Sequence, residues 1–234
     1  MERKRIFVLA NSRKTGGRCI AGREVVERGD QTSFGPWIRP VSNRGDGELS
    51  WEETCLANGG QVSLMSYVEL CLAGPVGNPC QPENWRIADG QRWVDVTNCY
   101  GLPSLAALQE YPQDLWHEPG YRSDRISHQR LVDHPPSQSL YLIRPSTLRI
   151  RLFTDSRDYR IRQVVFAYNG LEYEFPVTDP VLYNRYAGRI PNRGEPPLEE
   201  RLPCGDACLL CVSLADQFHG HHYKVVATIF ENVP

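Results

Sequence analysis

The sequence predicts a mainly β protein built from two small β-barrels with one or two short helices. Two patterns support this prediction: short apolar runs recur between Gly, Pro, Asn and Asp residues, and stretches with helical periodicity are scarce. The 234 residues, of which 41% are hydrophobic, suffice for one large domain or two small ones. Because Asp133–Ser137 contains a Pro-Pro pair near the middle, two barrels fit better than one sandwich.

Short apolar runs give the expected strands. In chain order they are Ile6–Ala10, Trp37–Val41, Val62–Leu72, Leu140–Ile143, Leu148–Phe153, Ile161–Tyr168, Tyr173–Thr178, Cys208–Leu214 and Lys224–Phe230. The clearest local feature is Asn169-Gly170, the preferred pair for a type I′ turn, which predicts a hairpin between Arg160–Tyr168 and Leu171–Phe175.

Two segments favour short helices. Leu102–Tyr111 has leucines at 102, 105 and 108 after a Pro-Ser start, and Trp51–Cys55 reads as a single helical turn. We therefore expect an N-terminal barrel over residues 1–118, which includes the helix near 102–111, and a C-terminal barrel over 119–234.

Nothing in the sequence predicts a membrane segment. No stretch approaches the roughly 20 apolar residues of a membrane helix. The apolar run after Met1–Arg5 is too short for a signal-peptide core. We expect a cytoplasmic protein with no membrane partner, in which the eight cysteines are mostly buried thiols.

Charge is unevenly distributed along a chain whose net charge is −2. Residues 1–44 hold ten Lys or Arg against four acids, and residues 120–162 hold nine Arg against four Asp. Residues 45–119 hold two Arg against eleven acids. The near-neutral total argues against a general polyanion binder but allows a local basic groove.

The Gly16-Gly17-Arg18 turn is the first candidate binding element. It lacks the glycine spacing of a P-loop or a dinucleotide-binding loop, which excludes those two classes of site. Glycine backbone and the cations Arg13, Lys14 and Arg18 suit a phosphate group. The alternative is a tight turn that needs glycine only for a positive φ angle.

Two more candidate residues follow on the strand Trp37–Val41. Trp37 and Arg39 alternate with Ile38 and therefore share one face, where they suit base stacking and phosphate contact. The alternative places Trp37 in the core and Arg39 at a solvated edge. Lys224, one of only three lysines, follows a His-rich stretch expected to form a hairpin turn, and is a further candidate ligand contact.

Cys204, Cys208 and Cys211 have the spacing of an iron–sulfur loop or part of a zinc site. However, Cys208–Leu214 reads as a buried strand, in which Cys208 and Cys211 point to opposite faces. Buried thiols are therefore the favoured interpretation, and we predict neither a metal nor another cofactor.

Catalytic patterns are weak. Asp46, Glu48, Glu52 and Glu53 suit either a metal-dependent nuclease or, more often, a solvated acidic loop. No serine occupies a nucleophile-elbow motif. The sequence identifies no catalytic residue, and a binding module is favoured over an enzyme.

Several short segments of the sequence resemble those of one poorly characterised prokaryotic family, the dual OB-containing domain. They are Leu9–Lys14, Gly17–Gly22, Trp37–Ser42, Glu83–Trp85, Ser139–Ile143, Thr178–Pro180, Cys211–Leu214 and Tyr223-Lys224. The resemblance implies two OB-like barrels, recognition of nucleic acid or a nucleotide, and a role in bacterial anti-phage or other conflict systems. It transfers no catalytic residues, because a fold does not fix a function.

The leading hypothesis is thus a module that binds nucleic acid or a nucleotide, with single-stranded nucleic acid favoured. Its candidate ligand-binding residues are Arg13, Lys14, Gly17, Arg18, Trp37, Arg39 and Lys224. One alternative is a metal-dependent nuclease or nucleotide-processing enzyme. The other is an adaptor whose acidic segment 45–119 binds a basic protein partner.

Overall fold

The computed structural model describes residues 1–14, 16–29, 31–45, 47–96, 105–202 and 208–231. The chain divides into two compact units. Unit 1 comprises Met1–Leu108 and Pro136–Ser139, and unit 2 comprises Gln109–Pro135 and Leu140–Pro234. The sequence predicts one boundary after residue 118, whereas in the structure residues 109–118 belong to unit 2 and Pro136–Ser139 belongs to unit 1.

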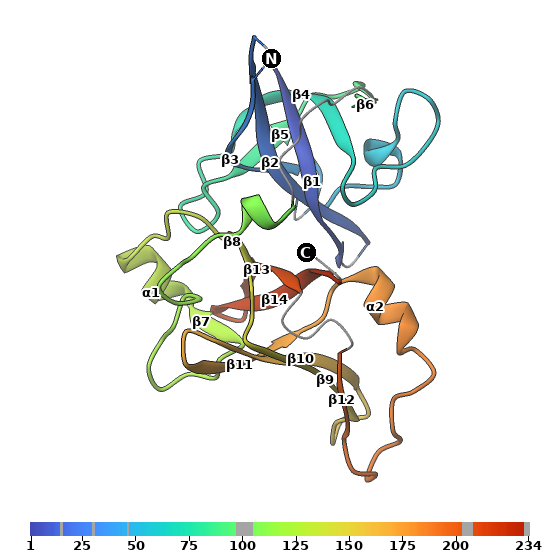
Figure 1. The fold of residues 1–234 in the computed structure, drawn as a ribbon, viewed down its shortest axis with the longest axis vertical. Coiled ribbons are helices and arrows are strands. Elements are labelled where there is room, and N and C mark those ends of the chain that lie inside the picture. The colour runs from blue at the N-terminus through green and yellow to red at the C-terminus, as the bar shows by residue number, and fades with distance from the viewer. Residues whose placement is uncertain (15, 30, 46, 97–104, 203–207, 232–234) are drawn as a thin grey trace. The chain divides into compact units, whose positions relative to one another are not determined.

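Unit 1 is a closed five-stranded barrel with one short additional strand (Figure 1). Its strands are β1 (Glu2–Lys14), β2 (Gly17–Arg28), β3 (Gln31–Val41), β4 (Tyr67–Pro75), β5 (Asn84–Ile87) and β6 (Val94–Asp95). The order β1-β2-β3-β5-β4 closes because β4 also pairs with β1. The β3–β5 pair is parallel and its neighbours are antiparallel, as in an OB-type barrel.

Alternation along the strands fills the interior of unit 1. Ile6 and Val8 of β1, Ile38 of β3 and Leu70 and Leu72 of β4 are almost fully buried in one apolar cluster. Trp93, which precedes β6, joins the same cluster. Because successive side chains of a strand point to opposite faces, this cluster sets which side chains remain at the surface.

Unit 2 consists of two four-stranded antiparallel sheets (Figure 1). One has the order β11-β10-β9-β12 and the other β7-β14-β13-β8. The strands are β7 (Arg125–Ser127), β8 (Leu140–Ile143), β9 (Thr147–Thr154), β10 (Arg160–Tyr168), β11 (Leu171–Pro176), β12 (Leu198–Arg201), β13 (Leu209–Phe218) and β14 (His221–Phe230). A parallel bridge between Val177 and Val226 links the two sheets into a half-barrel. The predicted mainly β fold with two barrel-like units is confirmed.

The helices are short. The expected turn at Trp51–Cys55 is the 3-10 helix η1 (Glu52–Thr54). Of the expected helix near 102–111, the first part lies outside the described residues and the rest contains only the 3-10 helix η2 (Leu105–Leu108). The α-helices of the described residues, α1 (His128–Asp133) and α2 (Pro180–Arg185), lie outside the two segments predicted to be helical. No helix among the described residues combines the length and apolarity that crossing a membrane requires.

Two hairpin turns follow the sequence prediction. Asn169 and Gly170 have φ angles of 49° and 77°, the positive pair that a type I′ turn requires, and Tyr168 pairs with Leu171. His219 and Gly220, with φ angles of 48° and 78°, form the corresponding turn between β13 and β14.

Candidate nucleic-acid interface

The end of the β1–β2 hairpin packs on the segment that follows β3. The last cross-strand pairs of the hairpin are Arg13 with Arg18 and Lys14 with Gly17. Arg18 and Leu49 exchange two backbone hydrogen bonds, each 2.9 Å long. The hairpin is therefore fixed against the loop that leads to η1.

This contact places a cation on an exposed aromatic ring. The guanidinium carbon of Arg18 lies 5.5 Å from the ring centroid of Trp51, and its Nη1 donates to the Asn11 side-chain oxygen at 2.9 Å. Trp51 is 59% exposed, so much of the indole remains open to solvent. The Arg18–Trp51 pair combines a held phosphate donor with a stacking surface.

Other cations surround this pair. The Arg44 side chain is 68% exposed, and its Nη2 lies 3.3 Å from both the Ser50 hydroxyl and the Glu53 carboxylate. Lys14 Nζ lies 3.8 Å from the Glu48 carboxylate. Arg13, Lys14, Arg18, Arg44 and Trp51 together are called the hairpin surface below.

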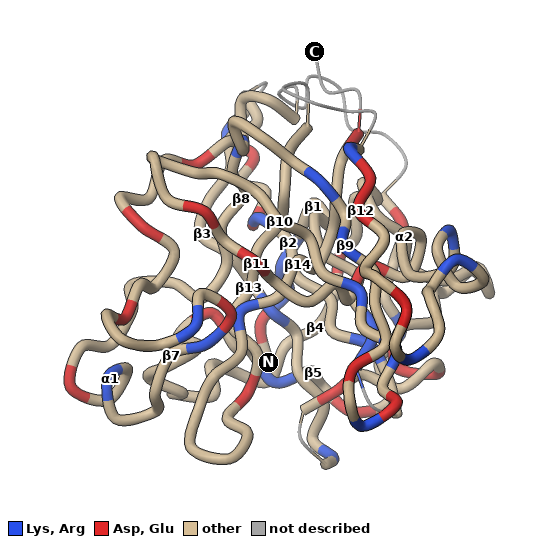
Figure 2. The backbone as a smooth tube through the Cα atoms, turned by 90° about the horizontal axis from the view of Figure 1, so that it is seen from below, with Lys and Arg blue, Asp and Glu red and all other residues tan. Residues whose placement is uncertain are grey.

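Most of the remaining cations of the basic N-terminal segment are neutralised. Lys4 lies 2.8 Å from both Glu2 and Glu24, and Arg5 contacts Glu27 and Glu69 at 2.5 and 2.9 Å. Figure 2 shows Lys or Arg positions and Asp or Glu positions on both strands and loops of the described backbone. The charge excess read from the sequence therefore overstates the positive surface.

Among the acids near the hairpin surface, Glu53 is held by hydrogen bonds. Burial opposes ionisation of Glu53, but hydrogen bonds from the Ser50 N–H, the Ser42 hydroxyl and Arg44 outweigh it and lower the pKa of this carboxyl. Asp46 lies outside the described residues. Among the described residues, Glu48, Glu52 and Glu53 form no group with the spacing of metal ligands, so the geometry offers no support for the nuclease alternative.

Gly17 has a steric reason to be glycine. A Cβ at this position would lie 2.5 Å from the Leu49 carbonyl oxygen, which is a steric clash. Gly16 adopts a φ of 88°, in the left-handed region. Gly16 thus allows the hairpin to turn, and Gly17 allows it to approach Leu49. This agrees with the alternative that the glycines are needed for the backbone of a tight turn.

The expected exposure of Trp37 and Arg39 is wrong. Each is only 3% exposed. Arg39 Nη2 lies 3.1 Å from Glu83 and 2.9 Å from the Ser139 hydroxyl, which also bonds Glu83. The guanidinium compensates a buried carboxylate, and Trp37 belongs to the core, so neither is presented to a strand of nucleic acid in this conformation.

The predicted ligand contact by Lys224 is also not supported, because this side chain is buried. It is 1% exposed, because alternation along β14 directs His222, Lys224 and Val226 to the buried side. Desolvation lowers the pKa of its ammonium to about 8, partly opposed by the negative charges of Asp124, Asp114 and Glu118. Lys224 is an interior residue of unit 2.

The cysteine cluster contains no complete set of thiolates. Cys208 is disulfide-bonded, so the expectation of a free thiol is wrong there, and Cys211 is a buried cysteine of β13 that forms no disulfide. Cys204 lies outside the described residues. A disulfide sulfur is not a thiolate, and Cys208 therefore cannot ligate a metal in this state.

Sequence reasoning missed the contributions of Trp51 and Arg44 to the hairpin surface. The sequence predicts only a helical turn at Trp51. Its polar neighbours, Ser50 before it and two glutamates after it, are the available signal, because they form no apolar pattern that would direct the indole into a core. The contact with Arg18, 33 positions earlier, could not be read from the sequence.

Comparison with known proteins identifies a family but no individual relative. A search of curated proteins and of solved structures found no significant similarity. The family model described as the dual OB-containing domain matches residues 4–229, nearly the whole chain and both units described above. The chain therefore belongs to the dual OB-containing domain family.

Proposed function

We propose that unit 1 binds single-stranded nucleic acid through the hairpin surface. The observation that carries this proposal is the cation–π contact of Arg18 with the exposed Trp51 at the β1–β2 turn. In OB-type barrels the loop between the first two strands commonly contributes to the binding of oligonucleotides. The position in the fold and the residue types thus support the same surface.

The residues of the hairpin surface suit contact with a short stretch of nucleic acid. The open face of Trp51 can stack on any base, and Arg18, Arg44, Lys14 and Arg13 can reach adjacent phosphates. Nearby carboxylates of Glu48 and Glu53 offset part of this charge. We expect only two or three phosphate contacts, hence a slope of log K against log salt of about −1.5 to −2.

Fluorescence anisotropy with labelled single-stranded DNA and RNA tests this proposal. Trp51→Ala should weaken binding by about 1–3 kcal/mol, because it removes the stacking surface. Arg18→Ala should weaken binding and reduce the salt slope by about 0.7, as expected for the loss of one phosphate contact. Arg3→Ala is a matched control, since Arg3 is a solvent-exposed cation of the same barrel outside the hairpin surface.

Equal affinity of all three variants for the oligonucleotides would refute the site. Cleavage of the oligonucleotides that requires Mg²⁺ or Mn²⁺ and stops with EDTA would instead favour the enzyme alternative. Specific capture of a basic protein, with no retention of nucleic acid, would favour the adaptor alternative.

We also propose that the protein acts in the prokaryotic cytoplasm, within an anti-phage or other conflict system. The support for this proposal is membership of the family alone. Comparing phage plating on cells with and without the intact gene tests it, and the Trp51→Ala variant should lose any protection.

A further inference from the structure

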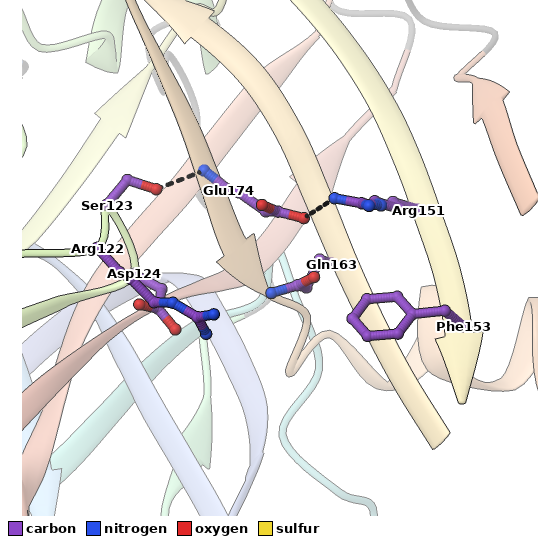
Figure 3. Close-up of a pocket in the computed structure, with 7 residues that line it drawn as sticks. All are labelled: Arg122, Ser123, Asp124, Arg151, Phe153, Gln163 and Glu174. Atoms are coloured by element: carbon purple, nitrogen blue, oxygen red, sulfur yellow. Dashed lines mark hydrogen bonds and ion pairs between the residues drawn. The ribbon is translucent and has the colours of Figure 1, made fainter. Parts of the chain in front are cut away.

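Unit 2 contains a pocket that the proposed function does not use. It has a volume of about 330 Å³ and is lined by the loop Arg122–Asp124 together with Arg151, Phe153, Gln163 and Glu174 (Figure 3). This volume falls at the lower end of the range of about 300–1000 Å³ typical of small-molecule sites. The pocket is therefore large enough for one small ligand and not for a folded partner.

The sheet β9–β10–β11 and one loop build the pocket. Arg151 and Phe153 lie two positions apart on β9 and so share a face, and Gln163 of β10 lies directly opposite Arg151. The Glu174 N–H of β11 donates to the Ser123 hydroxyl at 3.0 Å, which ties the loop to this sheet. The lining is thus held by backbone pairing and by a loop-to-strand hydrogen bond.

Most charges of the pocket are already balanced. Arg151 lies 2.9 Å from Glu174 and 3.4 Å from Glu199, and Asp124 accepts two hydrogen bonds from Arg125 at 2.9 and 3.0 Å. Arg122 differs, because no carboxylate among the described residues lies within ion-pair distance of its guanidinium. The pocket therefore offers one cation for an anionic group of a ligand.

The remaining groups suit a planar, hydrogen-bonding ring. Phe153 provides an aromatic face, and the Gln163 amide provides both a donor and an acceptor. Ionised carboxylates have about four acceptor sites each, so Asp124 and Glu174 can accept further hydrogen bonds from an amino group. Enzymes that hold a single base likewise combine stacking with hydrogen bonds to the base edge.

From this arrangement we infer that the pocket of unit 2 binds a mononucleotide whose base carries an exocyclic amino group. Phe153 stacks on the base, and Arg122 binds the phosphate. The amide of Gln163 and the carboxylates of Asp124 and Glu174 form hydrogen bonds with the polar edge of the base. This site is separate from the hairpin surface and goes beyond the strand binding proposed for unit 1.

Isothermal titration of the full-length protein with AMP, GMP, CMP and UMP tests the inference. At least one of the three amino-bearing nucleotides should bind more tightly than UMP, whose carbonyl oxygens face carboxylates. Phe153→Leu, which keeps an apolar side chain, should weaken binding roughly 5- to 150-fold through the loss of stacking. Arg122→Ala should weaken nucleotide binding but leave the weaker binding of the matching nucleoside unchanged.

Arg130→Ala, which removes an exposed arginine of α1, is the matched control and should bind as the wild type does. Absence of binding at millimolar nucleotide, equal binding of UMP, or unchanged affinity in both pocket variants overturns the inference. The two sites are distinguished by Trp51→Ala, which should lose oligonucleotide binding and keep mononucleotide binding, while the pocket variants do the reverse.

Discussion

At the scale of single residues, burial decides which cations can meet a ligand. Arg39 and Lys224 were candidates because of their residue type and strand position, yet both side chains are almost fully buried. Arg39 has a buried carboxylate and a hydroxyl as partners. Lys224 has no such ion pair among the described residues, and its pKa falls to about 8. The first cation stabilises a buried charge, whereas the second costs free energy of folding.

Lys224 should make the stability of unit 2 rise with pH. Below pH 8 the ammonium is protonated in both the folded and unfolded states, and the full cost of its burial is present. Between about pH 8 and 10.5 only the unfolded state keeps the proton, so the free energy of unfolding should rise with pH, by up to ~3 kcal/mol. Urea unfolding across this pH range measures the effect.

Lys224→Met should raise the stability at pH 7 by a similar amount and flatten its pH dependence, because methionine fills much of the same space without a charge. Lys14→Met, at a partly exposed lysine of unit 1, is the control and should change neither quantity measurably. A destabilised Lys224→Met protein would show that the ammonium has a favourable interior partner.

At the scale of the elements, the sequence predicted strands well where apolar residues are contiguous. It does not predict the short strands β5, β6, β7 and β12. It also misses the long strand β2, because Gly17–Arg28 mixes glycines, charges and small residues without a continuous apolar run. Part of the reason is Gly22, where a Cβ would lie 2.2 Å from the Phe7 carbonyl oxygen, so close packing of two strands requires a residue of low strand propensity.

The candidate site was less predictable than the fold. The β1–β2 turn with Arg13, Lys14 and Arg18 was found from local composition. The burial of Arg39 depends on Glu83, 44 residues later, and the cation–π contact of Arg18 depends on Trp51. Alternation along a strand gives two faces but does not tell which one a distant carboxylate covers.

Asp179 caps the N-terminus of α2 and also binds a backbone N–H of β14. Asp179 Oδ1 accepts from the N–H groups of Val181 and Leu182 at 2.8 and 3.1 Å, and Oδ2 accepts from the Ile229 N–H at 3.0 Å. Asp179→Ala removes the cap and leaves a strand N–H of β14 without its acceptor, so we expect a loss of about 2–4 kcal/mol in urea unfolding.

Asp179→Asn keeps one acceptor oxygen and should retain a substantial part of this stability. Equal losses in the alanine and asparagine variants would indicate that the negative charge, rather than the capping geometry, supplies the stabilisation.

At the scale of the whole molecule, the two units are not successive segments. Pro136–Ser139 belongs to unit 1 although unit 2 has residues on both sides of it. The returning segment ends in Ser139, which is fully buried and bonds both Arg39 and Glu83. A residue far along the chain thus completes the polar cluster of the first barrel.

Ser139→Ala should therefore destabilise unit 1. Loss of the hydroxyl removes one partner from each member of a buried charged pair, at a cost of about 1–3 kcal/mol. Hydrogen exchange should accelerate at the amides of β3 and near Glu83. Ser137→Ala, at an exposed serine in the same segment, should leave the exchange pattern unchanged. Faster exchange confined to unit 2 would contradict the assignment of Ser139 to the first barrel.

The return of Pro136–Ser139 also has a consequence for biosynthesis. A ribosome makes residues 109–135 of unit 2 before it makes Ser139, so the first barrel cannot acquire its last buried partner when residue 108 emerges. During that interval the Arg39–Glu83 pair exists without the serine hydroxyl, while the beginning of unit 2 is already outside the ribosome. Unit 1 is therefore complete only after part of unit 2 has been synthesised. For the same reason, no single cleavage of the polypeptide separates the two units intact.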